Sequence, residues 1–554
     1  MLLILSIFAL ALAGVWADGK TEAWLISGVL PMFDATNYYI DALRLLAGGQ
    51  FSEYSANKPL FSALFTMLLW IANHNLLNAL ALLTLLVGLG CYLLAEEIKR
   101  THGSVFAAFV LVVIFIYYRA HSGIVRTENL GILFSVLGMA FLWRAITDYH
   151  RPYYITGVFV TSLALIARPG PMFILPAIVL WGAYFFKSKG KKFSWKLIFG
   201  GGVAISLAFA INFLLFWTLG ERDSVPFGRF PYALYGLVSG GNYWTYVLEV
   251  NPSATEAEIY QMAFELFMEQ PTLIVRGILY NLSMFISNTG YGLYSYMRGE
   301  SGLASSVSYW VLLSLSLTGI LDWLRKRDNP YLGFVITATV GLIASVPFLP
   351  PTDAFRLRLY ASSIVILTLL PALGLWTILN HLHLLMPRKG NLNSTNHLYR
   401  FSTPILTIFI SVMIFFVPIV IKGIEPPPDF GDSKCGAEAT SLIIRYDPGT
   451  MIHLFPQSVQ FLDWTPTIHI GTFRRKVHDF PNFDFMDWAL KTVRPNTTLF
   501  YALDFRTSDE VLVVVKSNLL PTPPSMLELC GEWEEDRAVE DFNIFYPSLV
   551  SLLD

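Results

Sequence analysis

Residues 187–219 read KSKGKKFSWKLIFGGGVAISLAFAINFLLFWTL, a lysine-rich loop that leads into an uncharged apolar run. The run Leu197–Leu219 has the roughly 20 apolar residues that a helix needs to cross a bilayer. The chain of 554 residues is 54% hydrophobic and only 14% charged, whereas a soluble domain carries about 25% charge. These features predict a polytopic α-helical membrane protein.

Ten further apolar runs resemble Leu197–Leu219, and together they predict about eleven spans. They are Leu2–Ala17, Leu76–Ile98, Val105–Tyr118, Leu130–Ile146, Tyr153–Ala167, Met172–Phe186, Ala304–Leu324, Tyr331–Leu349, Leu359–His381 and Pro404–Ile421. Lys and Arg in short loops mark the cytoplasmic side. Lys187–Lys192 is the strongest such loop, and Lys99-Arg100, Arg325–Arg327 and Arg388-Lys389 agree with it when spans alternate.

This alternation places the N-terminus inside and the C-terminus outside, as expected for a multi-pass protein of a plasma or inner membrane. The run Leu2–Ala17 could instead be a cleaved signal peptide, but it lacks a basic start, so we favour an uncleaved span. Leu60–Ala72 and Leu273–Ile286 are short for spans and would break the alternation. We expect both to lie at the outer membrane surface or to dip into it.

Two domains follow from this topology. Residues 1–421 form a transmembrane module with outer loops 18–75 and 220–302, and residues 422–554 form a soluble extracytoplasmic domain. Short β-branched runs such as Val511–Val515 predict a small α/β or mostly β domain. Cys435 and Cys530 both lie there, where they could form a disulfide or remain two thiols. The net charge of −2 indicates no nucleic-acid partner.

Several cations contradict the positive-inside trend, because they fall at outer loops or outer span ends, and acidic residues accompany them. The cations are Lys58, Arg126, Arg168, Arg356 and Arg358, and the acids are Asp34, Asp41, Glu128 and Asp353. Each alone could be a solvated or snorkelling side chain. As a set at successive outer loops, they predict a functional site.

The residue types in this set suit a lipid-linked phosphate. Cations at headgroup level bind a phosphate and stabilise it as it leaves. A carboxylate beside them can take a proton from an attacking hydroxyl. A sugar carried on a lipid phosphate requires both groups. Residue types and topology alone do not separate sugar transfer from phosphate transport.

A resemblance to a known family adds to this interpretation. Residues 31–49 read PMFDATNYYIDALRLLAGG and are followed by Lys58-Pro59 at the start of an apolar helix. This order resembles the GT-C glycosyltransferase superfamily, and most of all its protein O-mannosyltransferase and lipid A aminoarabinose transferase branch. Arg126–Asn129, Ala167–Pro171 and Tyr235–Trp244 resemble further family segments. The resemblance covers roughly residues 1 to 420.

The resemblance implies a polyprenyl- or dolichyl-phosphate sugar as donor, and usually inversion at the anomeric carbon. It implies Asp34 as the catalytic base, with Glu128 orienting the acceptor or sharing that role. Phosphate binding would fall to the outer cations, which are Lys58, Arg126, Arg168, Arg356 and Arg358. Tyr38, Tyr243 and Trp244 would contact substrate, although the aromatic segment could equally be an interfacial belt.

Two departures from the family pattern bear on cofactors. Asn57 stands where the aminoarabinose transferase branch has an acidic residue implicated in metal binding, and this puts a divalent metal in doubt. Ala35 replaces the second acid of the family's Asp-Glu pair. His453 and His469 lack metal-ligand spacing. The sequence therefore predicts no definite metal site or other cofactor.

Structural roles compete with catalysis for several residues. Asp34 could be only the N-cap of a helix, Asp41 a solvated position on that helix, and Arg168 part of a turn. The main functional alternative is a transporter or flippase for lipid-linked sugars. A binding or assembly protein that acts through its outer tail is the other. Charges clustered at span ends on one side favour one-sided chemistry. Donor sugar and acceptor, whether protein, lipid or glycan, remain open.

Overall fold

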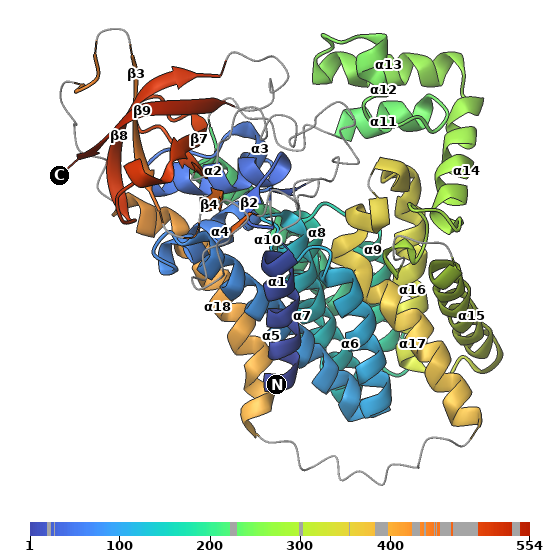
Figure 1. Cartoon of the computed structure of the whole chain (residues 1–554). Helices are drawn as coiled ribbons and strands as arrows, with labels where there is room; N and C mark the ends of the chain where they lie inside the picture. The colour runs from blue at the N-terminus through green and yellow to red at the C-terminus, as the bar shows by residue number, and fades with distance from the viewer. Residues whose placement is uncertain are drawn as a thin grey trace.

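The computed structural model describes most of the chain, namely residues 1–18, 24–26, 28–221, 230–297, 303–353, 355–382, 397–423, 433–436, 439–447, 449, 451–454, 467–468, 497–534 and 543–553. It consists of a helical bundle and a C-terminal β-sheet (Figure 1). The helices are α1 Leu2–Asp18, α2 Asp34–Leu46, α3 Glu53–Ala56, α4 Pro59–Ile71, α5 Leu76–His102, α6 Ser104–Tyr118, α7 Thr127–Asp148, α8 Arg151–Ala167, α9 Ile174–Phe185, α10 Trp195–Leu219, α11 Phe230–Val238, α12 Tyr246–Val250, α13 Glu256–Glu269, α14 Thr272–Ile286, α15 Leu303–Lys326, α16 Pro330–Ser345, α17 Ile364–His381 and α18 His397–Lys422.

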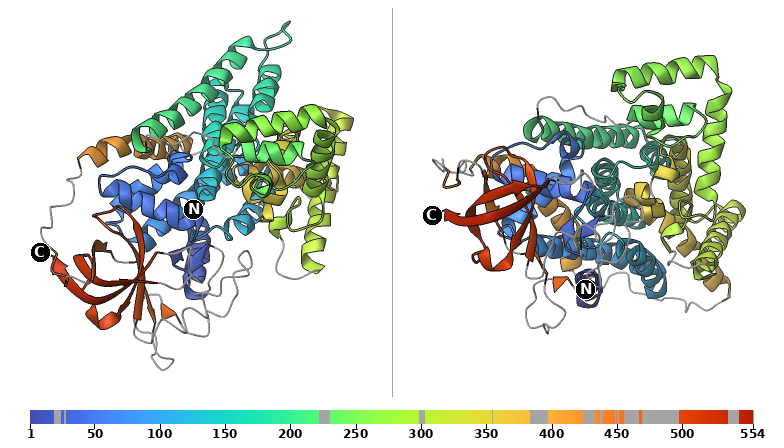
Figure 2. Two further views of the ribbon diagram at one scale, coloured as in Figure 1. Left: turned by 90° about the horizontal axis from the view of Figure 1, so that it is seen from above. Right: turned by 45° about the horizontal axis from the view of Figure 1, so that its top comes forward.

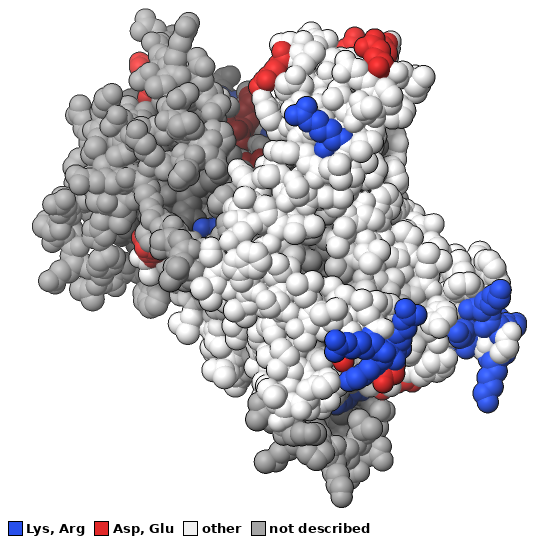
Figure 3. Space-filling view, turned by 90° about the vertical axis from the view of Figure 1, so that its right-hand side faces the viewer, with Lys and Arg blue, Asp and Glu red and all other residues white. Residues whose placement is uncertain are grey.

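Each apolar run predicted to span matches one of these helices, although Met172–Phe186, Tyr331–Leu349 and Leu359–His381 extend beyond the ends of α9, α16 and α17. Among the described residues, 7 helices are long and apolar enough to cross a membrane. The other four, α1, α6, α8 and α9, are shorter, with 17, 15, 17 and 12 residues. In Figure 3 the Lys, Arg, Asp and Glu of one face lie toward its two ends, with a broad uncharged band between them. The prediction of a polytopic helical membrane protein is confirmed.

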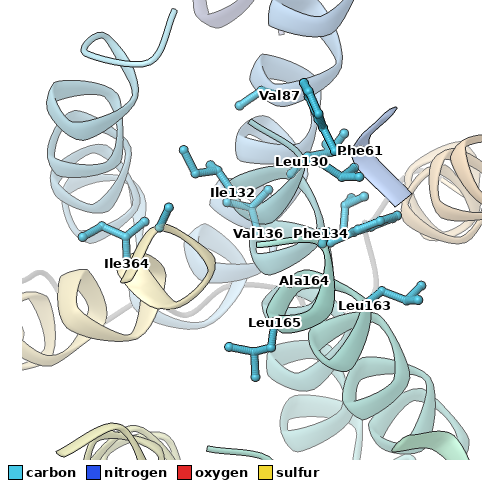
Figure 4. Close-up of a cluster of buried hydrophobic side chains, with 14 of the residues drawn as sticks. Phe61, Val87, Leu130, Ile132, Phe134, Val136, Leu163, Ala164, Leu165 and Ile364 are labelled. Carbon is cyan, nitrogen blue, oxygen red and sulfur yellow. The ribbon is translucent and has the colours of Figure 1, made fainter. Parts of the chain in front are cut away.

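Helix α7 is the centre of the bundle, because 94% of its most apolar window is buried. It packs against α5 and α8, and Figure 4 shows its residues Leu130–Val136 beside side chains of α4, α5, α8 and α17. A Cβ on Gly138 would lie 2.9 Å from the backbone nitrogen of Thr161. Glycine here lets α7 and α8 approach closely, as small residues do between membrane helices.

The contacts also show which helix ends lie together. Arg100 at the end of α5 donates to Asp148 at the end of α7 (2.6 Å), and Arg151 donates to the carbonyl of Phe186 (2.8 Å). The lysine-rich loop after α9 therefore shares one end of the bundle, here called the basic end, with these residues. The opposite end carries the starts of α7 and α17 and the end of α8.

The sheet consists of seven strands, β3 Thr440–Tyr446, β4 Met451–Leu454, β5 Thr467–Ile468, β6 Thr497–Leu503, β7 Glu510–Lys516, β8 Ser525–Trp533 and β9 Ile544–Leu553. Their order is β3-β8-β9-β7-β6-β4-β5, with β4–β5 and β7–β9 parallel and the other pairs antiparallel. The predicted strand Val511–Val515 lies inside β7. Within the described residues the domain has no α-helix, so it is the mostly β form of the prediction.

The sheet docks on α2, next to the bundle end opposite the basic end (Figure 2). The Arg44 guanidinium on α2 donates to the carbonyl of Ser508 from Nε (3.2 Å) and Nη2 (3.0 Å). Asp41 is 1% exposed and accepts from Arg44 and from Ser52. The expectation that Asp41 is solvated was wrong, because its carboxylate organises this junction.

The two short apolar segments differ from each other. Helix α4 does not lie on the surface, because Pro59–Leu69 are buried and α4 packs against α2, α5 and α18. Helix α14 exposes Val275, Leu279 and Ile286. It contacts the 3₁₀ turn Val346–Phe348 after α16 at one end of the bundle. Helix α14 also packs against α11, so it connects the bundle to the small unit α11–α13 (Figure 1).

Candidate functional site

Asp34 and Tyr38 come from the first turns of α2. Four residues apart, they lie on one face of this helix. The helix begins at Asp34, its N-cap position is Phe33 (φ 52°), and no side-chain cap hydrogen bond forms there. The interpretation of Asp34 as an N-cap is therefore wrong. Its carboxylate occupies the first turn, where the helix dipole favours a negative charge.

Five charged side chains meet at this end of the bundle, and we call them the charged cluster. They are Asp34, Arg126, Glu128, Arg168 and Arg358. Arg358 joins the two carboxylates, with Nη2 2.7 Å from Asp34 Oδ2 and Nε 2.6 Å from Glu128 Oε1. Residues that are far apart in the sequence thus form one connected network.

Glu128 is the most deeply buried member of the charged cluster, with a fully buried side chain. Its Oε1 accepts from Arg126 Nη2 at 2.8 Å, and Arg168 Nε lies 3.6 Å away. Arg126 and Arg168 are also buried, so Arg168 is not a solvated turn residue. Three guanidinium groups around one inaccessible carboxylate favour a positioning role for Glu128. Asp34, whose side chain is 26% exposed, is the accessible acid.

The turn before α17 aims Arg358 into the charged cluster. In the 3₁₀ segment Phe355–Ser363, Arg356 (φ 57°) and Leu357 (φ 56°) are left-handed. This conformation costs non-glycine residues roughly 1–2 kcal/mol each. The backbone N–H of Arg356 donates to Gly290 (2.9 Å) and Tyr117 Oη donates to the Leu357 carbonyl (3.3 Å). These bonds hold a kink that would otherwise be unfavourable.

Lys58 approaches the charged cluster from the start of α4. Its Nζ donates to Tyr38 Oη at 3.1 Å and lies 5.0 Å from the ring centroid of Tyr54. Tyr38 is buried, and this burial raises its pKa, with the Asp34 carboxylate raising it further. The Tyr38 hydroxyl therefore stays protonated and connects Lys58 with the helix that carries Asp34.

Two residues near the charged cluster were missed from the sequence. The Trp24 ring lies 4.1 Å from Arg126 Cζ and 4.5 Å from Arg358 Cζ, so one indole packs against two guanidinium groups. His121 is buried near Arg168, Arg356 and Arg358, and burial lowers its pKa to about 4. In the sequence, Trp24 is one tryptophan in a predicted outer loop, and His121 is one histidine a few residues before Arg126. Neither residue alone predicts a functional site.

Tyr243 and Trp244 lie elsewhere, in the α11–α13 unit. Tyr243 donates to Glu249 and packs against Tyr246, while Trp244 packs edge-on against Tyr232 at 6.0 Å. The unit has its own core around Tyr235, Val247 and Ile259. Burial raises the pKa of Glu256 at the start of α13, and the carboxylate of Glu53 beside Tyr54 raises it further.

The remaining sequence predictions concern the cysteines and possible metal ligands. Cys435 and Cys530 form a disulfide that ties the start of the domain to β8. Within the described ranges, no group of three or more His, Cys, Asp or Glu could hold a metal ion. Asp353 is described only by its backbone, as is His453, and His469 lies outside the described residues. The charged cluster is rich in cations, which disfavours a divalent cation at that place.

Comparisons with known proteins give limited similarity. No protein-family model matches the chain, and no curated protein matches it. Among solved structures, it is similar to the crystal structure of the oligosaccharyltransferase of Archaeoglobus fulgidus, tethered to an acceptor peptide with an NVT sequon through a disulfide bond. The TM-score is 0.38 and the identity 12%, over 77% of this chain and 56% of the other. The chain thus spans little more than half of that protein, and its function must be argued from the charged cluster itself.

Proposed function

We propose that the protein is a glycosyltransferase that moves a sugar from a polyprenyl- or dolichyl-phosphate to an acceptor hydroxyl. The observation that carries this proposal is the excess of positive charge in the charged cluster. Three arginines surround Glu128, one of them also pairs with Asp34, and Lys58 and Arg356 lie nearby. Buried charge without a counter-charge is costly, so this arrangement favours an anionic ligand. The phosphate of a lipid-linked sugar supplies that charge at the membrane surface.

The chemistry of transfer needs few groups. The acceptor oxygen attacks the anomeric carbon, and the bond from that carbon to the phosphate oxygen breaks with its electron pair on the phosphate. The phosphodiester thereby becomes a monoester with more negative charge, which arginines and Lys58 stabilise. The acceptor proton passes to Asp34, the accessible carboxylate of the charged cluster. Inversion at the anomeric carbon, which the resemblance to the GT-C superfamily implies, is the expected outcome.

Arg358 gives this scheme an order of binding. Its Nη2 holds Asp34 at 2.7 Å, while its Nε is anchored on buried Glu128. A donor phosphate competes with Asp34 for the Nη2 end without displacing the Nε bond. Donor binding would then release Asp34 to accept a proton. We therefore expect the donor to bind before the acceptor.

The remaining roles follow from position. Glu128 positions the arginines rather than taking the acceptor proton, and Tyr38 orients Lys58. Residues 1–421 would form the catalytic module and residues 422–554 a domain on the same outer side, docked on α2. Tyr243 and Trp244 would contact the acceptor only if the α11–α13 unit closes over the site. The acceptor class stays open between protein, lipid and glycan.

The test is to incubate the purified full-length protein with radiolabelled polyprenyl-phosphate sugars and membranes. Transfer of label to an acceptor, with release of polyprenyl phosphate, is the expected result. In sealed proteoliposomes, movement of intact labelled donor across the bilayer without transfer would instead identify a transporter. Failure of every donor to bind would refute the phosphate site itself.

A further inference from the structure

The hairpin between α9 and α10 carries an unusual charge. No Asp or Glu occurs between Asp148 and Glu221, whereas Lys187, Lys189, Lys191, Lys192 and Lys196 lie close together in this stretch. Lys189, Lys191, Lys192 and Lys196 are exposed, and Lys187 is half-exposed. We call residues 187–199 the lysine hairpin.

Several other cations of the basic end pair with carboxylates of the protein. Lys99 pairs with Glu96 (3.1 Å), Arg100 with Asp148 (2.6 Å) and Lys326 with Asp322 (3.1 Å). Among the described residues, no carboxylate pairs with a lysine of the hairpin. Its positive charge is therefore left for a ligand or for solvent.

Exposed aromatic side chains place these lysines at the depth of lipid headgroups. Trp195 is 74% and Phe199 76% exposed at the start of α10, and Tyr184 is exposed near the end of α9. Only 33% of the most apolar window of α10 is buried, so much of this span faces lipid. Tryptophan and tyrosine prefer the boundary between headgroups and acyl chains. Lys187 Nζ lies 3.8 Å from the Tyr184 ring, which keeps its charge at that boundary.

We propose that the lysine hairpin binds the phosphate headgroups of anionic phospholipids in the leaflet at the basic end. Unpaired ammonium groups next to lipid-facing aromatic rings attract such headgroups, and each lysine near a membrane surface strengthens binding about fivefold. The proposal is independent of sugar transfer, because the hairpin lies at the bundle end opposite the charged cluster.

The test compares two triple variants of the full-length protein. One carries Lys189→Gln, Lys191→Gln and Lys192→Gln. The control removes the same charge from the same end through Arg325→Gln, Lys326→Gln and Arg327→Gln. Native mass spectrometry measures the affinity of each protein for phosphatidylglycerol relative to phosphatidylcholine. Circular dichroism checks that each variant keeps its helical content.

The expected result is a preference for phosphatidylglycerol in the wild type that falls at least about tenfold in the hairpin variant and little in the control. Added salt should weaken the wild-type preference. An equal fall in both variants would show general attraction to the basic end and overturn the proposal. So would an unchanged preference in the hairpin variant.

Discussion

Replacing Glu128 by Gln tests whether this residue positions the arginines. Gln has nearly the same shape, but it removes the charge that faces Arg126, Arg168 and Arg358. Glu128 is fully buried and Arg126 only 2% exposed, so water cannot replace the lost charge. Breaking a buried ion pair by removing one partner costs about 3–5 kcal/mol. We expect a loss of unfolding free energy in that range.

The matched control is Asp148→Asn at the basic end. Asp148 pairs with Arg100 and Arg144, but it is 32% exposed. Screening by water limits such a pair to about 1 kcal/mol or less. Chemical unfolding in detergent micelles, followed by circular dichroism, measures both variants. Wild-type stability in Glu128→Gln together with abolished sugar transfer would refute the positioning role and make Glu128 a catalytic residue.

Three further predictions concern the same molecule. Trp24→Ala should weaken binding of a polyprenyl-phosphate sugar, whereas Trp24→Phe should keep most of it, because a phenyl ring can still pack on the guanidinium groups; equilibrium binding of labelled donor measures both. Lys58→Ala should lower donor affinity by about 1.5–3 kcal/mol, the strength of a charge-assisted hydrogen bond, while Lys99→Ala at the opposite end should not. Burial lowers the pKa of His74 to about 4, below its unfolded value, so its contribution to stability falls as pH drops from 6.5 toward 4. Between pH 7.5 and pH 5 the unfolding free energy of His74→Gln should therefore fall by about 1–2 kcal/mol less than that of the wild type.

The Asp447 carboxyl beside His74 changes the pH dependence in the opposite direction. Burial raises the pKa of Asp447 to about 6, and Arg445 pairs with it at 2.8 Å. A carboxyl with a raised folded pKa adds stability as pH falls through 6. In the wild type this gain partly offsets the loss from His74, and it remains when His74 is replaced. An identical pH dependence in wild type and variant would contradict the assignment.

Much of the fold was predictable because membrane helices leave strong one-dimensional signals. Apolar runs such as Leu197–Leu219 appear as helices, and the basic residues Lys99-Arg100 and the loop Lys187–Lys192 lie at the same end of the bundle. The strand at Val511–Val515 follows from β-branched residues. The sequence did not reveal that α4 is buried within the protein, because a short apolar helix buried by protein has the same composition as one buried by lipid.

The charged cluster was predictable in membership but not in geometry. Arg358 opposes the positive-inside trend, Asp34 and Glu128 are acids at the same predicted outer side, and the three do meet. Burial is a property of tertiary packing, so the sequence could not separate buried Glu128 from accessible Asp34. For the same reason it did not reveal Trp24, whose role depends on two arginines that are distant in the chain. Asp41 was misjudged because its burial depends on Ser52 from the following loop and on the sheet that docks beside Arg44.

The measurement that tests the proposed function most directly is sugar transfer by the Asp34→Asn variant, with donor binding measured on the same preparation. Asparagine keeps the size of the side chain but cannot accept the proton. We expect near-normal donor binding and a fall in turnover of about 10²–10⁴-fold, the usual contribution of a general base. Turnover close to that of the wild type would contradict the assignment of Asp34 as the base.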